Sequence, residues 1–172
     1  FYKNSWNQMI YTAEEIGGAQ TISSISFLVG GLSSTAWTAD NLVVYMGHTT
    51  LGGYSGGTDL TTSNWVPQGS LTQVFSRTSY TPTTSTTYTN DYSGTAWVTI
   101  SLSTSFNYNG TDNLAIVISQ KCSTYQSGLQ FKYITDKKYL CLYRNSDSDA
   151  TYANHPGTNT GTRSYNRPVL KL

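Results

Sequence analysis

The stretch 97–119, WVTISLSTSFNYNGTDNLAIVIS, decides the fold. In its first part, apolar residues at 98, 100 and 102 alternate with Trp97, Thr99 and Ser101, which predicts a strand with one apolar face. Residues 114–118 are apolar throughout, as in a central strand that is covered on both sides. The Asn-Gly pair at 109–110 has the composition of a tight turn. The stretch therefore predicts a strand, a short corner and a second strand.

Further strands are predicted on both sides of this pair from apolar alternation or short apolar runs, at 9–11, 21–29, 42–46, 71–75, 129–133, 139–143 and 169–172. In 21–29 the alternation shifts midway, which predicts either a β-bulge or a strand that is buried on both faces toward its end. Residues 13–16 form at most one short helical turn before Gly17 and Gly18, and 30–40, 47–64 and 145–166 are polar loops. The pattern favours an all-β fold, a two-sheet antiparallel β-sandwich that is jelly-roll-like, with residues 1–172 as one domain.

Composition excludes several classes of function. The net charge is +1 and only 11% of the residues are charged, so we expect no nucleic-acid partner. No apolar run approaches the roughly 20 residues that span a bilayer, so we expect no membrane span. A surface rich in Thr, Ser, Asn, Gly and Tyr suits a secreted or cell-surface protein. The chain begins at Phe1 without a signal-like segment, and we expect a module excised from a larger secreted protein.

The two cysteines, Cys122 and Cys141, leave two interpretations open. Each lies at or near a predicted strand, so a disulfide forms if their Cα atoms come within about 7 Å. Two buried thiols are the alternative. Two cysteines alone do not make a zinc site, and both histidines are far from them in the sequence.

A serine-hydrolase pattern is present but lacks its context. Residues 53–57, GYSGG, match G-x-S-x-G with Ser55 at the nucleophile position. That elbow requires a strand before the serine and a helix after it, and no helix-forming run follows. His48 and His155 lie in predicted loops, where we expect nothing to orient a base. We therefore expect a glycine-rich loop and a protein that is not an enzyme.

The only glutamates, Glu14 and Glu15, are adjacent and point in different directions, so they cannot by themselves flank a glycosidic bond. One of them, together with backbone carbonyls and Asp112, offers the oxygen ligands of a structural calcium. The alternative is a glutamate that caps the short helical turn or lies in solvent. No other cofactor is required.

Aromatic residues are the best candidates for ligand contact. If the polar face of its strand is open to solvent, Trp97 is a flat ring on which a sugar can stack; if a second layer covers it, Trp97 is core. Trp37 and Tyr54 lie in predicted loops, where packing demands aromatics less often. Trp65 comes before Val66-Pro67 and is expected to close one end of the sandwich, but it stays a candidate. We expect at least one of these rings to bind a ligand.

The order of these segments resembles a known family. The segments are IYTAEEIGG (10–18), TISSISFLV (21–29), NLVVYMGHTT (41–50), NWVPQGSLTQVF (64–75), the stretch 97–119 and RPVLKL (167–172). They resemble a β-sandwich accessory domain of large secreted Bacteroidota proteins, similar to carbohydrate-binding modules. The matching residues are mostly fold-makers: Tyr11, Glu15, Ile25, Phe27, Thr49, Trp65, Phe106, Gly110 and Asn113. The resemblance implies secretion and a place beside catalytic or adhesive domains, and it fixes no activity.

These observations predict a non-catalytic carbohydrate-binding module. A polysaccharide or glycan would stack on Trp97, or on Trp37 and Tyr54 at a loop rim, while Asn, Gln, Thr and Asp side chains bind its hydroxyls. The alternative is a structural or adhesive spacer domain that holds neighbouring domains or contacts a host protein without binding sugar.

Overall fold

The computed structural model describes residues 2–32, 38–54, 61–82, 96–125 and 129–172. The helices and strands follow in this order: β1 (Asn4–Tyr11), α1 (Ala13–Ile16), β2 (Gln20–Leu32), β3 (Ala39–Thr49), β4 (Thr61–Thr62), η1 (Gln68–Ser70), β5 (Thr72–Tyr80), β6 (Trp97–Tyr108), β7 (Asn113–Lys121), β8 (Leu129–Phe131), β9 (Tyr133–Thr135), β10 (Cys141–Ser146), η2 (Ala150–Ala153), β11 (Gly161–Ser164), β12 (Asn166–Pro168) and β13 (Leu170–Lys171).

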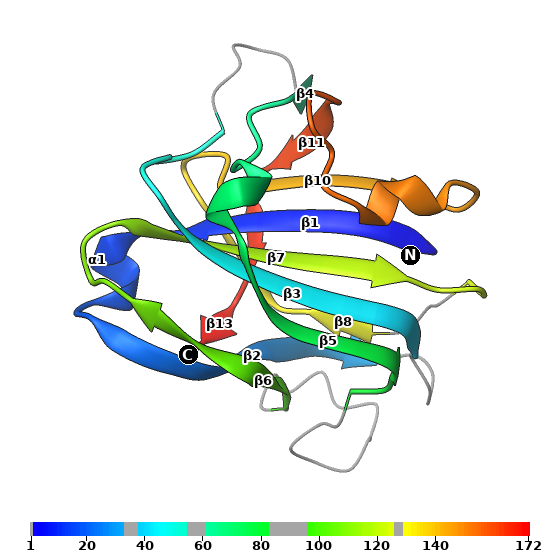
Figure 1. The fold of residues 1–172 in the computed structure, drawn as a ribbon, viewed down its shortest axis with the longest axis horizontal. Coiled ribbons are helices and arrows are strands. Elements are labelled where there is room, and N and C mark those ends of the chain that lie inside the picture. The colour runs from blue at the N-terminus through cyan, green and yellow to red at the C-terminus, as the bar shows by residue number, and fades with distance from the viewer. Residues whose placement is uncertain (1, 33–37, 55–60, 83–95, 126–128) are drawn as a thin grey trace.

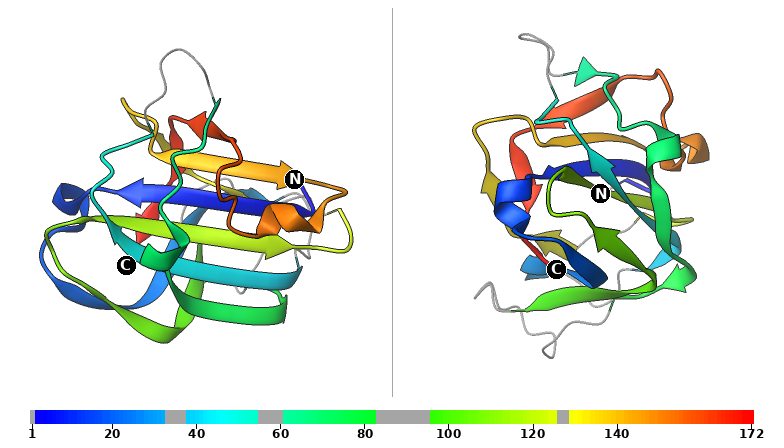
Figure 2. Two further views of the ribbon diagram at one scale, coloured as in Figure 1. Left: turned by 45° about the horizontal axis from the view of Figure 1, so that its top comes forward. Right: turned by 60° about the vertical axis from the view of Figure 1, so that its left-hand side comes forward.

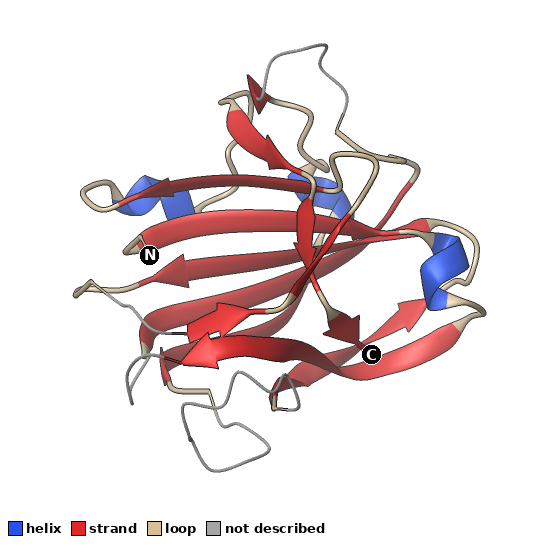
Figure 3. Ribbon diagram, turned by 180° about the vertical axis from the view of Figure 1, so that it is seen from behind, coloured by secondary structure: helices blue, strands red, loops and turns tan. Residues whose placement is uncertain are grey.

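The strands form two main layers (Figures 1 and 2). The larger sheet has the order β4-β11-β10-β1-β7-β3-β5, and the smaller has the order β13-β2-β6, with β8 also paired to β2. A ribbon of β12 and β9 is separate. The short helical turns lie at the periphery of the sheets (Figure 3). The predicted all-β, two-sheet antiparallel sandwich is confirmed, and α1 is the predicted helical turn.

The stretch that decides the fold links the two layers. β6 pairs with β2 in the smaller sheet, whereas β7 lies between β1 and β3 in the larger one. At the corner, the Asn109 side-chain oxygen accepts hydrogen bonds from the backbone of Thr111 and Asp112, at 3.0 and 3.1 Å. Gly110 has φ of +78°, and a Cβ there would collide with the Ala19 backbone. The Asn-Gly corner is therefore required by the crossing from one sheet to the other.

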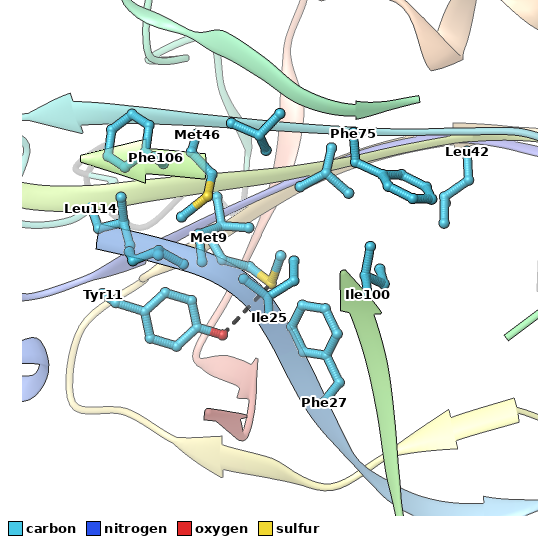
Figure 4. Close-up of a cluster of buried hydrophobic side chains, with 14 of the residues drawn as sticks. Met9, Tyr11, Ile25, Phe27, Leu42, Met46, Phe75, Ile100, Phe106 and Leu114 are labelled. Carbon is cyan, nitrogen blue, oxygen red and sulfur yellow. Dashed lines mark hydrogen bonds between the residues drawn. The ribbon is translucent and has the colours of Figure 1, made fainter. Parts of the chain in front are cut away.

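Two cores lie on opposite faces of the larger sheet. The main core lies between the sheets and includes Met9, Ile25, Phe27 and Ile100 (Figure 4). A second, smaller core covers the other face, with these buried members: Trp6, Ile10, Tyr54, Trp65, Val117, Leu140 and Leu142. Residues 114–117 of β7 are fully buried because they contribute to both cores. The prediction of a central strand covered on both sides is confirmed.

The register of β2 shifts between Ile22 and Ser24, as the alternation predicts. Other predicted elements are wrong in extent. The single strand predicted at 129–133 is instead two: β8 pairs with β2 and β9 with β12. The predicted loops 47–64 and 145–166 contain the end of β3, and the end of β10 with η2 and β11, respectively. In the described part of the chain, no helix is long and apolar enough to cross a membrane.

Candidate functional site

Among the predicted rings that the structure describes, the accessible one is Trp97, on the outer face of the smaller sheet. On β6, Val98 and Ile100 are buried between the sheets, while Thr99 and Ser101 are exposed on the other side. Trp97 shares that outer side and is half-buried. Strand alternation thus places the indole among exposed hydroxyl groups. This corresponds to the first of the two interpretations of Trp97, a ring on a polar face of the strand.

Polar groups surround this indole. The hydroxyls of Ser26 and Thr99 hydrogen-bond across β2 and β6 at 2.9 Å. The Lys171 ammonium, from the neighbouring β13, lies 5.1 Å from the centroid of the Trp97 ring. This distance is within the range of a cation–π contact, which is weak at an exposed site. We call this surface, formed by Trp97, Thr99, Ser101 and Lys171, the Trp97 face.

Tyr54 is an interior residue, so the prediction that it stacks on a ligand at a loop rim is wrong. Its side chain is 2% exposed, and its hydroxyl accepts a hydrogen bond from the buried Gln8 amide at 2.7 Å. The Tyr54 backbone donates to Tyr139 and accepts from Arg163. Burial raises the pKa of the Tyr54 phenol above its usual value. Loop position did not predict exposure, because this loop covers the second core.

Trp65 also belongs to the second core. It is 6% exposed, its indole N–H donates to the Asn159 carbonyl at 2.7 Å, and its ring lies against Gly161, where a Cβ would collide with it. Its place is on the outer face of the larger sheet, where it is unavailable for stacking. Trp37, the remaining predicted ring, lies outside the described residues.

A hollow of about 630 Å³ brings together three residues that the sequence singled out, His48, Trp65 and Asp112. It lies between the segments around His48 and around Asn64, and most of the lining is polar. Because the Trp65 ring is almost wholly buried, the hollow offers hydrogen bonds to a ligand but little stacking surface. It is therefore a weaker candidate than the Trp97 face.

The sequence reasoning missed a group of exposed tyrosines. Tyr133 on β9 is 60% exposed, and Tyr165, just before β12, is 42% exposed. The Tyr165 ring stacks on Tyr139 with 3.9 Å between centroids, and the Arg163 guanidinium lies 4.3 Å from the Tyr139 centroid. The pairing of β9 with β12 brings Tyr165 beside the segment after β9, so no local pattern could have found its contact with Tyr139.

The carboxylate of Glu15 is part of an ion cluster around the buried Arg167. The fully buried Arg167 donates to Glu15 and Asp136 through two hydrogen bonds each, and to the Ile10 carbonyl at 2.7 Å. Glu15 also forms a capping box with Thr12 at the start of α1, which is the alternative that the sequence left open. The hydrogen bonds from Arg167 lower the pKa of the Glu15 carboxyl to about 2.

The calcium site near Glu14, Glu15 and Asp112 stays a prediction. The Asn113 side chain accepts from the Ala13 backbone at 2.9 Å, so α1 does lie beside the start of β7. The Asp112 carboxylate, however, accepts from the Asn109 side chain, and Glu15 is engaged with Arg167. Among the described residues, no three His, Cys, Asp or Glu side chains gather as metal ligands.

Both cysteines are buried thiols, which settles the alternatives left open above. The Cys122 backbone donates to Lys3, just before β1, whereas Cys141 pairs with Met9 near the end of β1. Lys3 and Met9 are six residues apart in extended chain, so the two cysteines lie roughly 20 Å apart along β1. That separation is too large for a disulfide.

The histidines are held by backbone groups, so the expectation that nothing orients them is wrong. His48 lies on β3, and its Nε2 accepts from the Asn109 backbone at 3.1 Å. His155 Nδ1 accepts from the Gly157 backbone, so its Nε2 donates to the Val66 carbonyl at 2.9 Å. Ser55 lies outside the described residues.

Comparison with known proteins adds no name. Searches against models of protein families, curated proteins and solved structures each find no match. The residues of the fold and its surfaces therefore supply the argument for function.

Proposed function

We propose that this chain is a non-catalytic carbohydrate-binding module of a secreted or cell-surface protein, and that a glycan binds at the Trp97 face. The supporting observation is the half-buried indole of Trp97 beside the exposed hydroxyl residues Thr99 and Ser101 on one open sheet surface.

The chemistry of this face suits a sugar ring. The C–H bonds of one pyranose face are apolar and stack on an indole, which has a negative face and needs no charge on the ligand. The hydroxyls at the rim of the ring then lie beside the Thr99 and Ser101 hydroxyls and the Lys171 ammonium. Lys171 is exposed, so a sugar displaces its ammonium from the indole at small cost. An open face with one ring gives modest affinity.

Affinity electrophoresis against plant, fungal and host glycans tests the proposal. The parent domain should be retarded by at least one polysaccharide. Trp97→Leu keeps apolar volume but removes the flat ring, and we expect it to weaken retardation about tenfold. Tyr125→Ala is the matched control, because it deletes an aromatic ring that is 61% exposed and lies outside the Trp97 face.

Two outcomes would contradict carbohydrate binding at this face. The first is retardation by a glycan that is unchanged in Trp97→Leu and abolished in Tyr133→Ala. Binding would then lie on the β9–β12 ribbon instead. The second is no retardation by any glycan of the panel. Unfolding in urea, followed by fluorescence, establishes that each variant is folded before it is compared.

The spacer or adhesive role has its own supporting observation. Tyr133, Ile134 and Tyr165 are all more than 40% exposed and lie on or beside the β9–β12 ribbon. Exposed apolar groups in one region are typical of protein contact sites. Binding of the domain to immobilised collagen, fibronectin or fibrinogen, lost in Ile134→Ser and retained in Trp97→Leu, would favour this role.

A further inference from the structure

The space between the two sheets is not completely filled. A cavity of about 350 Å³ lies there and is lined by strands of both layers. Its most deeply buried lining includes Met9, Phe27, Leu42 and Ile100, which Figure 4 draws in the main core, together with Val98 and Cys141. The volume is within the usual range of small-molecule sites, roughly 300–1,000 Å³.

The polarity of the lining changes along the strands. On β1, Ser5, Asn7 and Met9 alternate onto the same inward face, and all three line the cavity. Ser5 pairs with Gln120 on one side and with Asn145 on the other, and both of these also line it. One end of the cavity is therefore apolar and the other carries a hydroxyl and three amides.

These polar side chains are not needed to complete the core. The Asn7 amide donates to the Ser5 hydroxyl at 3.0 Å, and Gln120 donates to the Tyr2 backbone at 3.3 Å. The Asn145 side chain makes no hydrogen bond to another described residue. Asn7, Gln120 and Asn145 are only half-buried, so the hydrogen-bonding groups that they leave unused find partners in water or in a bound ligand. A ligand with hydrogen-bonding groups at one end would supply those partners.

The lining also limits the ligand's charge and size. None of the described side chains that line the cavity is acidic or basic. An ionised group would enter without a counter-charge, which is strongly unfavourable. At roughly 30 Å³ for each water-sized group, the volume holds about a dozen non-hydrogen atoms.

We propose that the inter-sheet cavity binds a small neutral amphipathic molecule, with an apolar chain between the sheets and an uncharged amide or hydroxyl end at Asn7, Gln120 and Asn145. This site is separate from the Trp97 face. Val98 and Ile100 line the cavity and alternate with Trp97 and Thr99, so the two sites lie on opposite sides of β6.

Decanamide and decanoate are the probes. Each has about twelve non-hydrogen atoms and the same chain, but only decanoate is charged at pH 8. Titration calorimetry should give micromolar binding of decanamide and affinity for decanoate at least tenfold weaker. Decanamide should also slow maleimide labelling of Cys141, which lines the cavity, and not of Cys122, which does not.

Two variants locate the binding. Ile118→Phe adds a ring to the lining, and Asn145→Leu removes an amide at the polar end without filling the apolar part. Each should weaken decanamide at least fivefold, whereas Thr104→Phe, which adds the same ring at an exposed position of β6, should not. Equal binding of both probes, no binding of decanamide, or no effect of Asn145→Leu in a folded protein would overturn the proposal.

Discussion

Replacing Arg167 by methionine should destabilise the fold more than almost any other single substitution of a polar residue. Its side chain is fully buried, and all five N–H donors of the guanidinium are used: two toward Glu15, two toward Asp136 and one toward the Ile10 carbonyl. The guanidinium also lies 4.4 Å from the centroid of the Tyr11 ring. This one residue ties β12 to β1, to α1 and to the segment after β9.

The expected loss follows from what remains behind. Removing one partner of a buried ion pair costs about 3–5 kcal/mol, because the other charge stays without compensation. Here the Glu15 side chain is 39% exposed and Asp136 is 16% exposed, so water partly re-solvates the carboxylates. The Ile10 carbonyl loses its partner as well, at about 1 kcal/mol or more. Methionine keeps much of the apolar stem, so we expect a loss of about 3–4 kcal/mol.

Urea unfolding at pH 7, followed by tryptophan fluorescence, measures the free energy of unfolding. The control is the triple variant Glu15→Gln, Asp136→Asn, Arg167→Met, which removes the charges together. It should be more stable than Arg167→Met alone, because no carboxylate is left unpaired. A loss below about 1 kcal/mol in the single variant, or a triple variant that is no more stable, would refute the argument that uncompensated charge dominates.

Three further predictions concern pH and packing. Arg167 holds the pKa of Glu15 at about 2, against 4.5 ordinarily, so the stabilisation by the Glu15 carboxylate is complete above pH 4.5 and is lost as the pH falls toward 2. In urea titrations at decreasing pH, the free energy of unfolding of Glu15→Gln should therefore fall by about 1–2 kcal/mol less than that of the parent. Burial raises the pKa of Cys141 to about 12, so alkylation at pH 8 should be slow until urea unfolds the chain. Gly161→Ala forces a Cβ into Trp65 and should lower stability by about 1–3 kcal/mol in thermal melts, whereas Gly52→Ala, with open space, should not.

The sequence predicted the fold class because that information is local. Alternation in 97–102, the apolar run 114–118 and the Asn-Gly corner are each short-range patterns, and the structure contains all three elements. The bulge in β2 was visible for the same reason. The strand predicted at 129–133 failed because Lys132 carries the chain from β8 to β9: its backbone donates to Leu28 and accepts from Val169. Nothing in the local alternation marks that exchange of partners.

Sites were harder to predict than strands, because exposure depends on which segment covers which face. Tyr54 and Trp65 lie in loops, yet these loops close over the second core of the larger sheet. The apolar run 114–118 predicted a cover on both faces of the central strand, but it did not indicate which loops supply the outer cover. For Trp97, alternation along β6 predicts which face of the strand it lies on, and its role in binding stays a prediction.

The polar residues on the inward face of β1 are the most informative of these differences between sequence and structure. Strand alternation requires Ser5 and Asn7 to face inward with Met9, and the pairing with β7 and β10 adds Gln120 and Asn145 to the same end. Taken alone, each of these polar residues is typical of a solvent-facing position, so the sequence does not indicate a cavity. Together they make one end of an apolar space able to hydrogen-bond, without any charge. Because Asn7, Gln120 and Asn145 are half-buried, water also satisfies them, but a neutral amphipathic ligand would use both parts of this space.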